Sequence, residues 1–553
     1  MRSLLLSLPL LSLIVAQPAL AQTAPAPTAP AAAAAAAPAP LTPEQAAIKA
    51  HVAFLASDAL RGREAGTPDY DVAAEYVASQ MLAAGLSPAG KDGSWFQPVP
   101  LVAAKPAGEP VMALNIAGRQ VPMVFGQDWT IRVTPVAERI DLSAPVVFAG
   151  YGVVDPKTGR DDYRGLDVRG KIVAILYNGI KGLNSEIAAH LGNRVDRARL
   201  AKARGAVGVV VLESSQIHAV FPFEAMAKGW DSRGVTWADA AGKPRDPGAP
   251  VLGMLSFAGA EKLFEGSKIR WSDVRAADDA GKKLPTGPLA ATLSTDQRYT
   301  IEHIESDNVV GMLRGSDPQL ANEVVVLSAH LDHVGVTEPV NGDAINNGAL
   351  DNAIGIASML EVARAFGAEA NRPKRSLLFV AVTAEEKGLI GSDYFATNPT
   401  VAKEDIVANV NLDMPILTYR FVDLVAFGAD RSSIGPAVAA AAKARGFALV
   451  PDPEPEEASF VRTDHYSFVR QGVPSVSLSP GPGGPGAAAT KAFLDNNYHQ
   501  PSDDMRLPID WKAAEDFVEV NEAIVRTLAD APDRPRWNKG DYFGTLYKGP
   551  MAK

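Results

Sequence analysis

The sequence predicts an α/β fold in which helices cover both faces of a mostly parallel central sheet. Three continuous apolar runs in the second half of the chain, 323–327, 376–383 and 406–412, have the length and β-branched content of strands buried on both faces. Helical patterns occur between such runs, as at 354–366 and 437–445. Because parallel neighbours need a crossover connection, strands that alternate with helices favour this arrangement.

The same alternation continues to the end of the predicted core. Further strands are expected at 421–427 and 473–478, and a helix at 511–528 places its apolar residues on one face. We therefore assign 300–531 to the main domain and treat 532–553 as a C-terminal tail.

The stretch 105–299 differs in character and predicts a smaller, β-rich α/β domain inserted into the main domain, whose first part is 42–104. Pro122 restricts the first expected strand of this insert to a sheet edge, because proline cannot donate a ladder hydrogen bond. The elements expected in the insert are strands at 121–126, 144–152, 170–177 and 209–212 and a helix at 197–204.

The amino terminus has the pattern of an export signal. One arginine, a short apolar run and Ala19-Leu20-Ala21 predict a signal peptide over 1–21, cleaved before Gln22. Residues 22–41 are almost all Ala, Pro and Thr and are expected to form a linker. Order is expected to resume at Thr42-Pro43-Glu44-Gln45, a capping box with proline at the first helical position.

Composition limits the classes of partner and compartment. The chain has a formal charge of -10 and no basic cluster, so nucleic acid and anionic membranes are not expected as partners. It has no cysteine, which excludes disulfides, thiolate metal sites and a cysteine nucleophile. With the export signal, this composition favours a periplasmic or secreted protein without a membrane anchor. The oligomeric state is left open.

Two imidazoles and several carboxylates follow the predicted strands. His330, Glu386 and Asp413 lie at the ends of three of the apolar runs, and His499 lies in a late polar loop. Asp351 is in the loop that enters the helical pattern at 354, where a carboxylate either caps the helix or bridges two cations. This set of side chains suits two divalent metal ions with a hydrolytic water between them.

Four further residues have supporting interpretations. Asp332 lies two positions after His330, and strand alternation predicts that its carboxylate accepts a hydrogen bond from the histidine ring nitrogen that does not bind metal. Glu385 precedes Glu386 at a strand end, where adjacent side chains diverge, so one ligates metal and the other acts as a base. His333 and His465 are assigned at most a supporting or substrate-side position.

These motifs resemble the zinc aminopeptidases of peptidase family M28. The amino-terminal stretches 54–63 and 83–86 are similar to the opening segment of that family. The motifs that carry the resemblance occur in the order Ala329-His330-Leu331-Asp332-His333, Leu350-Asp351-Asn352, Glu385-Glu386-Lys387-Gly388, Asn411-Leu412-Asp413-Met414 and His499.

The resemblance implies a zinc exopeptidase-like fold and roles for the motif residues. One zinc ion is expected on His330, Asp351 and Asp413, and the second on Asp351, Glu386 and His499. Asp351 would be the bridge and Glu385 the general base. Imidazole ligands favour Zn2+ over Mg2+, and Co2+ or Mn2+ are possible substitutes.

The expected activity is the removal of amino-terminal residues from peptides. A carboxypeptidase or an amidohydrolase on the same two-zinc scaffold is an alternative, and a basic pocket residue such as Arg462 or Arg470 would favour an enzyme that reads a carboxylate. A peptide-binding protein without catalysis is a further alternative. The run from Lys202 to Val211 in the insert resembles the protease-associated (PA) domain, which is inserted in some members of the family.

Overall fold

The computed structural model describes residues 40–133, 135, 137–177, 180, 182–368, 370 and 372–553. The predicted signal peptide and nearly all of the predicted linker lie outside these residues. Residues Leu41–Lys553 form one compact unit. No helix in the described part of the chain combines the length and apolarity needed to cross a bilayer.

The first helix begins as the sequence predicts. The side chain of Thr42 accepts a hydrogen bond from the backbone of Gln45 at 3.2 Å, and the Gln45 side chain accepts one from the Thr42 backbone at 3.3 Å. This reciprocal pair starts α1 (Pro43–Leu55) with Pro43 in its first turn. A second capped helix, α2 (Pro68–Ala83), follows.

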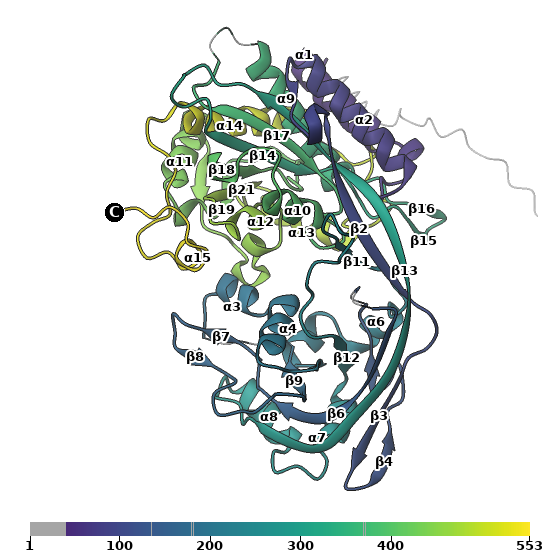
Figure 1. Ribbon diagram of the computed structural model, residues 1–553. Coiled ribbons are helices and arrows are strands. Elements are labelled where there is room, and N and C mark those ends of the chain that lie inside the picture. Colours follow the sequence, from purple (N-terminus) through teal and green to yellow (C-terminus); the bar gives the residue numbers. More distant parts are fainter. Residues whose placement is uncertain are drawn as a thin grey trace, which may run out of the picture. The chain divides into compact units, whose positions relative to one another are not determined.

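The central sheet is mostly parallel, which confirms the predicted fold class (Figure 1). β14 (Val324–His330) pairs in parallel with both β17 (Ser376–Val382) and β18 (Ile406–Asn411). β18 pairs in parallel with β21 (Ser475–Pro480). On one side of these strands, β17 pairs antiparallel with β13 (Gly287–Leu313), which pairs antiparallel with β1 (Ser87–Pro88). On the other side, β21 pairs antiparallel with β19 (Asp423–Phe427), which pairs in parallel with β20 (Ala448–Val450).

Helices cover both faces of this sheet because both faces are apolar. Along β14, Val325 and Leu327 join one hydrophobic cluster, and Val324 and Val326 join another. The first cluster lies against α1, α2, α9 (Ile354–Ala368), α11 (Ile434–Ala444), α13 (Gly486–Asn496) and α14 (Trp511–Asp530). The second lies against α10 (Ile390–Thr397) and α12 (His465–Val469).

A second sheet is built from the region of the predicted insert. In it, β4 (Arg119–Pro122) pairs with β3 (Val111–Ile116), so Pro122 lies in an edge strand as expected. The sheet continues from β3 through β13, β6 (Arg139–Phe148), β9 (Ile172–Leu176), β10 (Gly208–Leu212) and β12 (Val251–Leu255) to β5 (Trp129–Thr130). Its helices are α3 (Ser185–Leu191), α4 (Arg194–Ala203), α5 (Ser215–Val220), α6 (Phe223–Lys228), α7 (Phe257–Phe264) and α8 (Trp271–Asp279).

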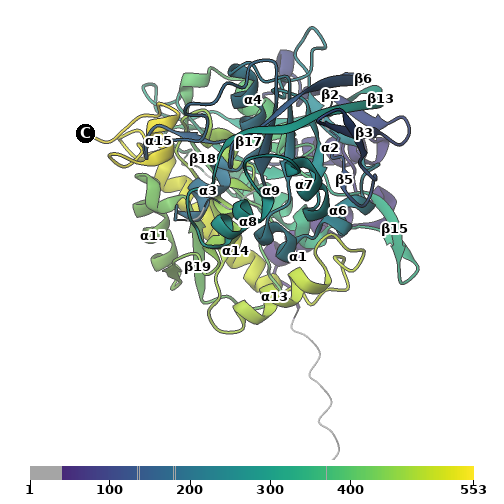
Figure 2. The same cartoon turned by 90° about the horizontal axis from the view of Figure 1, so that it is seen from below.

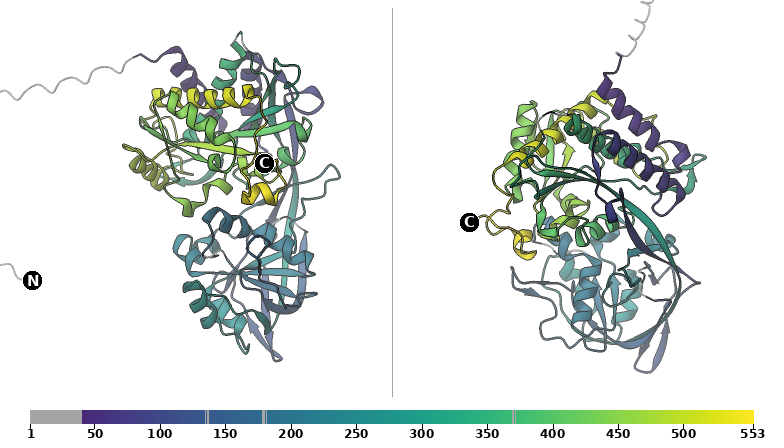
Figure 3. Two further views of the ribbon diagram at one scale, coloured as in Figure 1. Left: turned by 90° about the vertical axis from the view of Figure 1, so that its left-hand side faces the viewer. Right: turned by 45° about the horizontal axis from the view of Figure 1, so that its top comes forward.

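Two long strands join the sheets. β13 pairs with β3 and β6 through residues 287–298, and with β17 through residues 309–313. Between these segments it pairs with β2 (Phe96–Pro106), whose outer edge carries β11 (Gly234–Trp237). Figure 2 shows β13 seen from below, and Figure 3 shows the whole fold in two further views. The predicted boundaries after 104 and before 300 therefore fall inside continuous strands.

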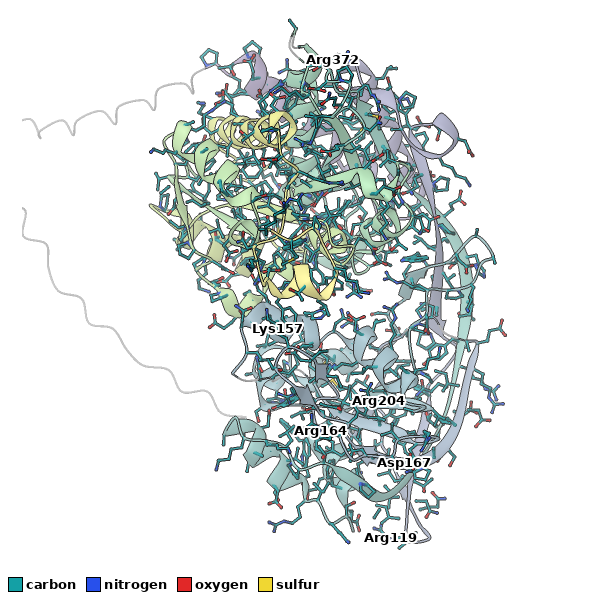
Figure 4. The ribbon with its side chains drawn as sticks, turned by 60° about the vertical axis from the view of Figure 1, so that its left-hand side comes forward. Arg119, Lys157, Arg164, Asp167, Arg204 and Arg372 are labelled. Carbon is teal, nitrogen blue, oxygen red and sulfur yellow. The ribbon has the colours of Figure 1, made fainter. Side chains whose placement is uncertain are left out.

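The residues predicted as a C-terminal tail are packed against the rest of the chain. Trp537 is fully buried, and its indole nitrogen donates to the Gly472 carbonyl at 2.8 Å. The short helix α15 (Tyr542–Leu546) follows it. Lys157 donates to the Gly540 carbonyl at 2.9 Å and is labelled in Figure 4. Lys157 lies between two short strands of the insert region, β7 (Val154–Asp155) and β8 (Arg160–Asp161).

Candidate metal centre

The parallel strands bring the predicted ligands to one edge of the central sheet. His330 is the last residue of β14, Glu385 and Glu386 follow the end of β17, and Asp413 follows the end of β18. Because these strands are parallel, their carboxyl ends lie at the same edge. Asp351 reaches this edge from the turn that precedes α9.

The carboxylate of Asp351 lies between two groups of donor atoms. Its Oδ1 is 3.2 Å from Nε2 of His330, which is also 3.1 Å from Oδ1 of Asp413. Its Oδ2 is 3.4 Å from Nε2 of His499, which is also 3.0 Å from Oε2 of Glu386. The structure thus brings the five predicted ligands together, with one oxygen of Asp351 directed at each group.

His333 also lies in the centre, closer than the sequence analysis expected. Its Nδ1 is 2.8 Å from Oε1 of Glu386 and 3.8 Å from Oδ2 of Asp351. Among the described residues, these three form one of two sets in which one donor atom from each residue lies within 4.8 Å of the others; the other set is His330, Asp351 and Asp413. The signal in the sequence was the spacing of His333, three residues after a strand-end histidine.

The prediction that the Asp332 carboxylate accepts a hydrogen bond from His330 is wrong, because the Asp332 backbone accepts it instead. The second ring nitrogen of His330, Nδ1, is 3.0 Å from the backbone carbonyl oxygen of Asp332. The Asp332 carboxylate instead accepts from the backbone nitrogens of Glu385 at 3.0 Å and Glu386 at 3.3 Å. Strand alternation does not apply because β14 ends at His330. Asp332 therefore orients the histidine through its backbone and the two glutamates through its side chain.

The loop that carries Asp351 is fixed by two buried polar side chains. The Asp503 carboxylate accepts from the backbone nitrogens of Leu350 at 2.9 Å and Asp351 at 3.0 Å. The Asn352 side chain donates to the Leu412 carbonyl at 2.9 Å and accepts from the Met414 backbone at 3.1 Å. These bonds hold the Asp351 loop beside the segment that carries Asp413.

Arg63, at the end of the amino-terminal stretch 54–63, links that stretch to the loops of the metal centre. It is buried, and its guanidinium donates to the carbonyls of Leu331 at 2.9 Å, Asn347 at 2.6 Å and Gly348 at 3.2 Å. Gly62 beside it has a φ of +74°, and a Cβ there would lie 2.5 Å from the Asn346 carbonyl oxygen. No role was predicted for Arg63 or Asp503 from the sequence, although Asp503 lies four residues after His499, because their hydrogen bonds go to backbone atoms of segments distant in the chain.

Electrostatic pairing keeps the proposed ligands charged. Burial acts to raise the pKa of Asp351, but hydrogen bonds from His330 and His499 hold it well below its usual range. Burial and the Asp351 charge act to raise the pKa of Glu386, and hydrogen bonds from His333 and His499 lower it to about 2. Burial acts to lower the pKa of His499, but its bonds to the two carboxylates raise it to about 10.

Glu385 is in a different environment. Burial raises its pKa well above its usual range, and the nearby charges of Asp413, Asp464 and Glu386 raise it further against the opposing charge of His330. Asp464, at the start of α12, is fully buried, and neither carboxylate oxygen has a hydrogen-bond partner among the described residues. Strongly raised carboxyl pKa values of this kind are frequent at functional sites.

The donor set fits divalent metal ions. Imidazole nitrogens and carboxylate oxygens are the ligands of hydrolytic zinc sites. Nε2 of His499 is buried and lies 3.0 Å from Oε2 of Glu386 and 3.4 Å from Oδ2 of Asp351. Buried carboxylates that lie this close together require positive charge between them. The donor set could therefore hold divalent metal ions.

Comparison with known proteins agrees with this donor set. Residues 308–525, which include all five predicted ligands, match the model of peptidase family M28. This segment belongs to peptidase family M28. The M28 segment begins inside β13 and ends inside α14, so it contains most of the central sheet and none of residues 105–299.

Curated relatives share parts of the chain. A protein of Pyricularia oryzae named "Probable zinc metalloprotease" is 37% identical over 112 residues, 20% of this chain and 21% of its own length. "Probable leucine aminopeptidase 2" of Aspergillus fumigatus is 28% identical over 240 residues, 40% of this chain and 44% of its own length. The chain therefore spans less than half the length of either relative.

Among solved structures, an aminopeptidase from Aneurinibacillus sp. strain AM-1 aligns over 89% of this chain and 95% of its own length. The TM-score is 0.49 and the sequence identity 19%.

Proposed function

We propose that the protein is an exported zinc aminopeptidase that uses two metal ions and a glutamate general base. The observation that carries this proposal is the position of Asp351, with one carboxylate oxygen directed at His330 and Asp413 and the other at His499 and Glu386. The predicted signal peptide over 1–21 supports export.

Each residue of the centre has a role in the proposed reaction. When bound, two zinc ions would supply Lewis-acid polarisation of the scissile carbonyl and a lowered pKa for water. His330 and Asp413 hold one position, His499 and Glu386 hold the other, and Asp351 serves both. Glu385 accepts a proton from the attacking water and passes it to the leaving amine.

The charges of the site favour a substrate amine over a substrate carboxylate. The Arg470 guanidinium makes hydrogen bonds of 2.7 and 3.0 Å to both oxygens of Asp196. Arg462 is more than half exposed and bonds to the Glu457 carboxylate at 2.8 Å. Both arginines that would support a carboxypeptidase are therefore paired with acids. The carboxyl group of Asp464 lies near Glu385, and burial raises the pKa of Asp464 to about 7.

We also infer that residues 105–299 form a PA-like domain that shapes access to the site. His190 on α3 is 2.6 Å from the Tyr466 hydroxyl on α12. Trp237 on β11 donates to the Asp393 carboxylate of α10 at 2.6 Å. Because Asp464 directly precedes α12 and lies near Glu385, these contacts connect the insert to the helices next to the proposed base.

The direct test is hydrolysis of aminoacyl p-nitroanilides by the zinc-loaded mature protein, each beside its N-acetylated counterpart. We expect cleavage of the free-amine substrates alone, abolished by a chelator and restored by zinc. Cleavage of N-acylated dipeptides with a free carboxylate, and not of the p-nitroanilides, would support the carboxypeptidase alternative. A protein that binds zinc and cleaves neither class would contradict the proposal.

A further inference from the structure

The imidazoles of His330, His333 and His499 face the carboxylates of the metal centre. They differ in the surroundings of the ring nitrogen that points away from these carboxylates. A histidine that binds metal through one nitrogen nearly always has a hydrogen-bond partner at the other. His330 meets this condition through the Asp332 carbonyl at 3.0 Å. The His499 side chain is 35% exposed, so solvent reaches its ring. His333 is fully buried, and its Nε2 has no hydrogen-bond partner among the residues that the structure describes.

The distances from the ring nitrogens to the carboxylate oxygens also distinguish His333 from His330 and His499. Two atoms bound to one tetrahedral zinc ion at about 2.1 Å lie about 3.4 Å apart. The nitrogens of His330 and His499 are 3.0 to 3.4 Å from the oxygens that would share their metal ions. Nδ1 of His333 is 2.8 Å from Oε1 of Glu386 and 3.8 Å from Oδ2 of Asp351. The shorter distance is that of a hydrogen bond between an N–H group and a carboxylate.

Packing fixes the His333 ring independently of any metal. Gly348 has a φ of +60°, and a Cβ at this position would lie 2.7 Å from Cγ and Cδ2 of His333. The ring therefore lies directly against the Gly348 backbone. On another side it meets the His499 ring edge to face, with centroids 5.6 Å apart. The His333 backbone nitrogen donates to the Arg63 carbonyl at 3.3 Å, which holds the main chain in place.

We propose that His333 is a positioning residue and not a third imidazole ligand. Its Nδ1–H donates to Oε1 of Glu386, so the carboxylate presents Oε2 to the metal position that it shares with His499 and Asp351. Oε2 would then be the oxygen available to a metal ion, while His333 holds Oε1. This inference rests on the proposed two-metal function, since it assigns a role beside that site.

Two substitutions separate the role of Nδ1 from that of the ring. In His333→Asn, the side-chain amide lies near the position of Nδ1 and keeps a donor for Glu386. In His333→Gln, the amide lies near the position of Nε2, and Glu386 loses its donor. We expect His333→Gln to weaken binding of the second zinc ion about 10- to 100-fold, as loss of such partners does. We expect His333→Asn to retain wild-type affinity, with His303→Ala, at an exposed histidine, as the control.

The measurements are zinc affinity by competition with a chromophoric chelator and the number of imidazoles per zinc by X-ray absorption. With His330 and His499 as the imidazole ligands of two ions, we expect one imidazole per zinc in the wild type and in both variants. A ratio near 1.5 in the wild type that falls in both variants would make His333 a ligand and overturn the inference. Equal weakening in His333→Asn and His333→Gln would also overturn it. Failure of the wild type to bind two zinc ions would instead contradict the proposed function.

Discussion

Arg470 and Asp196 form a two-bond ion pair between the end of α12 and helix α4 of the insert. The two hydrogen bonds are 2.7 and 3.0 Å long, and both side chains are less than one third exposed. Arg470 directly follows α12, the helix that Asp464 precedes beside the proposed base. The pair therefore connects the insert to the region of the catalytic glutamate through one short helix.

We expect Asp196→Asn to lower the free energy of unfolding by about 1.5 to 3 kcal/mol at pH 7, as loss of a hydrogen-bonded charge does. Urea unfolding followed by fluorescence measures the difference. The control is Asp167→Asn, which removes the partner of Lys171 in an exposed pair of the insert and should leave stability unchanged. Asp167 is labelled in Figure 4. An equal effect of the two substitutions would contradict a specific role for the pair.

The contribution of this pair should depend on pH. Burial acts to raise the pKa of Asp196, but the hydrogen bonds and charge of Arg470 hold it below its usual range. A carboxyl group whose pKa is lower in the folded state stabilises the protein above its unfolded pKa of about 3.9 and loses this effect as the pH falls. The difference between the wild type and Asp196→Asn should therefore be full at pH 6 and disappear in acid.

Glu385→Gln should keep the metals and lose turnover. The glutamine preserves size and hydrogen-bonding capacity but cannot accept a proton, so we expect the rate to fall about 10²- to 10⁴-fold. Metal analysis should still find two zinc ions per chain. Glu338→Gln, on the exposed strand β15 (Val336–Val340), is the control and should leave the rate unchanged. Loss of zinc together with activity in Glu385→Gln would show that Glu385 is a ligand.

Asp351→Ala should release both zinc ions together. The reason is that each of its oxygens lies within 3.4 Å of a histidine nitrogen in a different donor group. Elemental analysis after dialysis measures the zinc content. Asp343→Ala, on the nearby strand β16 (Asp343–Ile345), serves as the control and should retain both ions. Two zinc ions retained in Asp351→Ala would refute the bridging role.

Tyr498 should contribute to the reaction and Tyr419 should not. The Tyr498 ring stacks on the His499 ring with centroids 3.9 Å apart, and burial and the charges of Asp351 and Glu386 raise its pKa. Its hydroxyl has no hydrogen-bond partner among the described residues and is free to donate to a substrate oxygen. Tyr419 donates to the Gly481 carbonyl at 2.8 Å. We expect Tyr498→Phe to reduce kcat about 10²-fold, whereas unchanged kcat would assign the ring to packing.

Trp537→Ala should destabilise the protein although it lies in the predicted tail. Removal of a fully buried tryptophan costs about 3 to 5 kcal/mol through lost contacts and the cavity that remains. The midpoint of urea unfolding measures this cost. Leu546→Ala, at an exposed position of α15, is the control and should have little effect. An unchanged midpoint in Trp537→Ala would mean that the segment does not stabilise the fold.

The fold class and the clustering of the candidate ligand residues could both be predicted from the sequence. The apolar runs that became β14, β17 and β18 are buried on both faces, so their composition alone distinguishes them from surface strands. Their ends carry the histidine and the carboxylates that meet at one edge. The fixed two-residue alternation failed for Asp332 because the strand ends before it, and the chain turns there to meet Glu385 and Glu386.

What the sequence determined by itself is the order of strands, the capped first helix and the residue types available to a metal centre, because these depend on local periodicity and composition. The positions of Arg63, His333, Asp464 and Asp503 were decided by tertiary structure. Each of them is buried beside the centre through contacts between loops that lie far apart in the chain. Such contacts follow from how the layers pack, and the only sign of them in the local sequence is the spacing of His333 from His330.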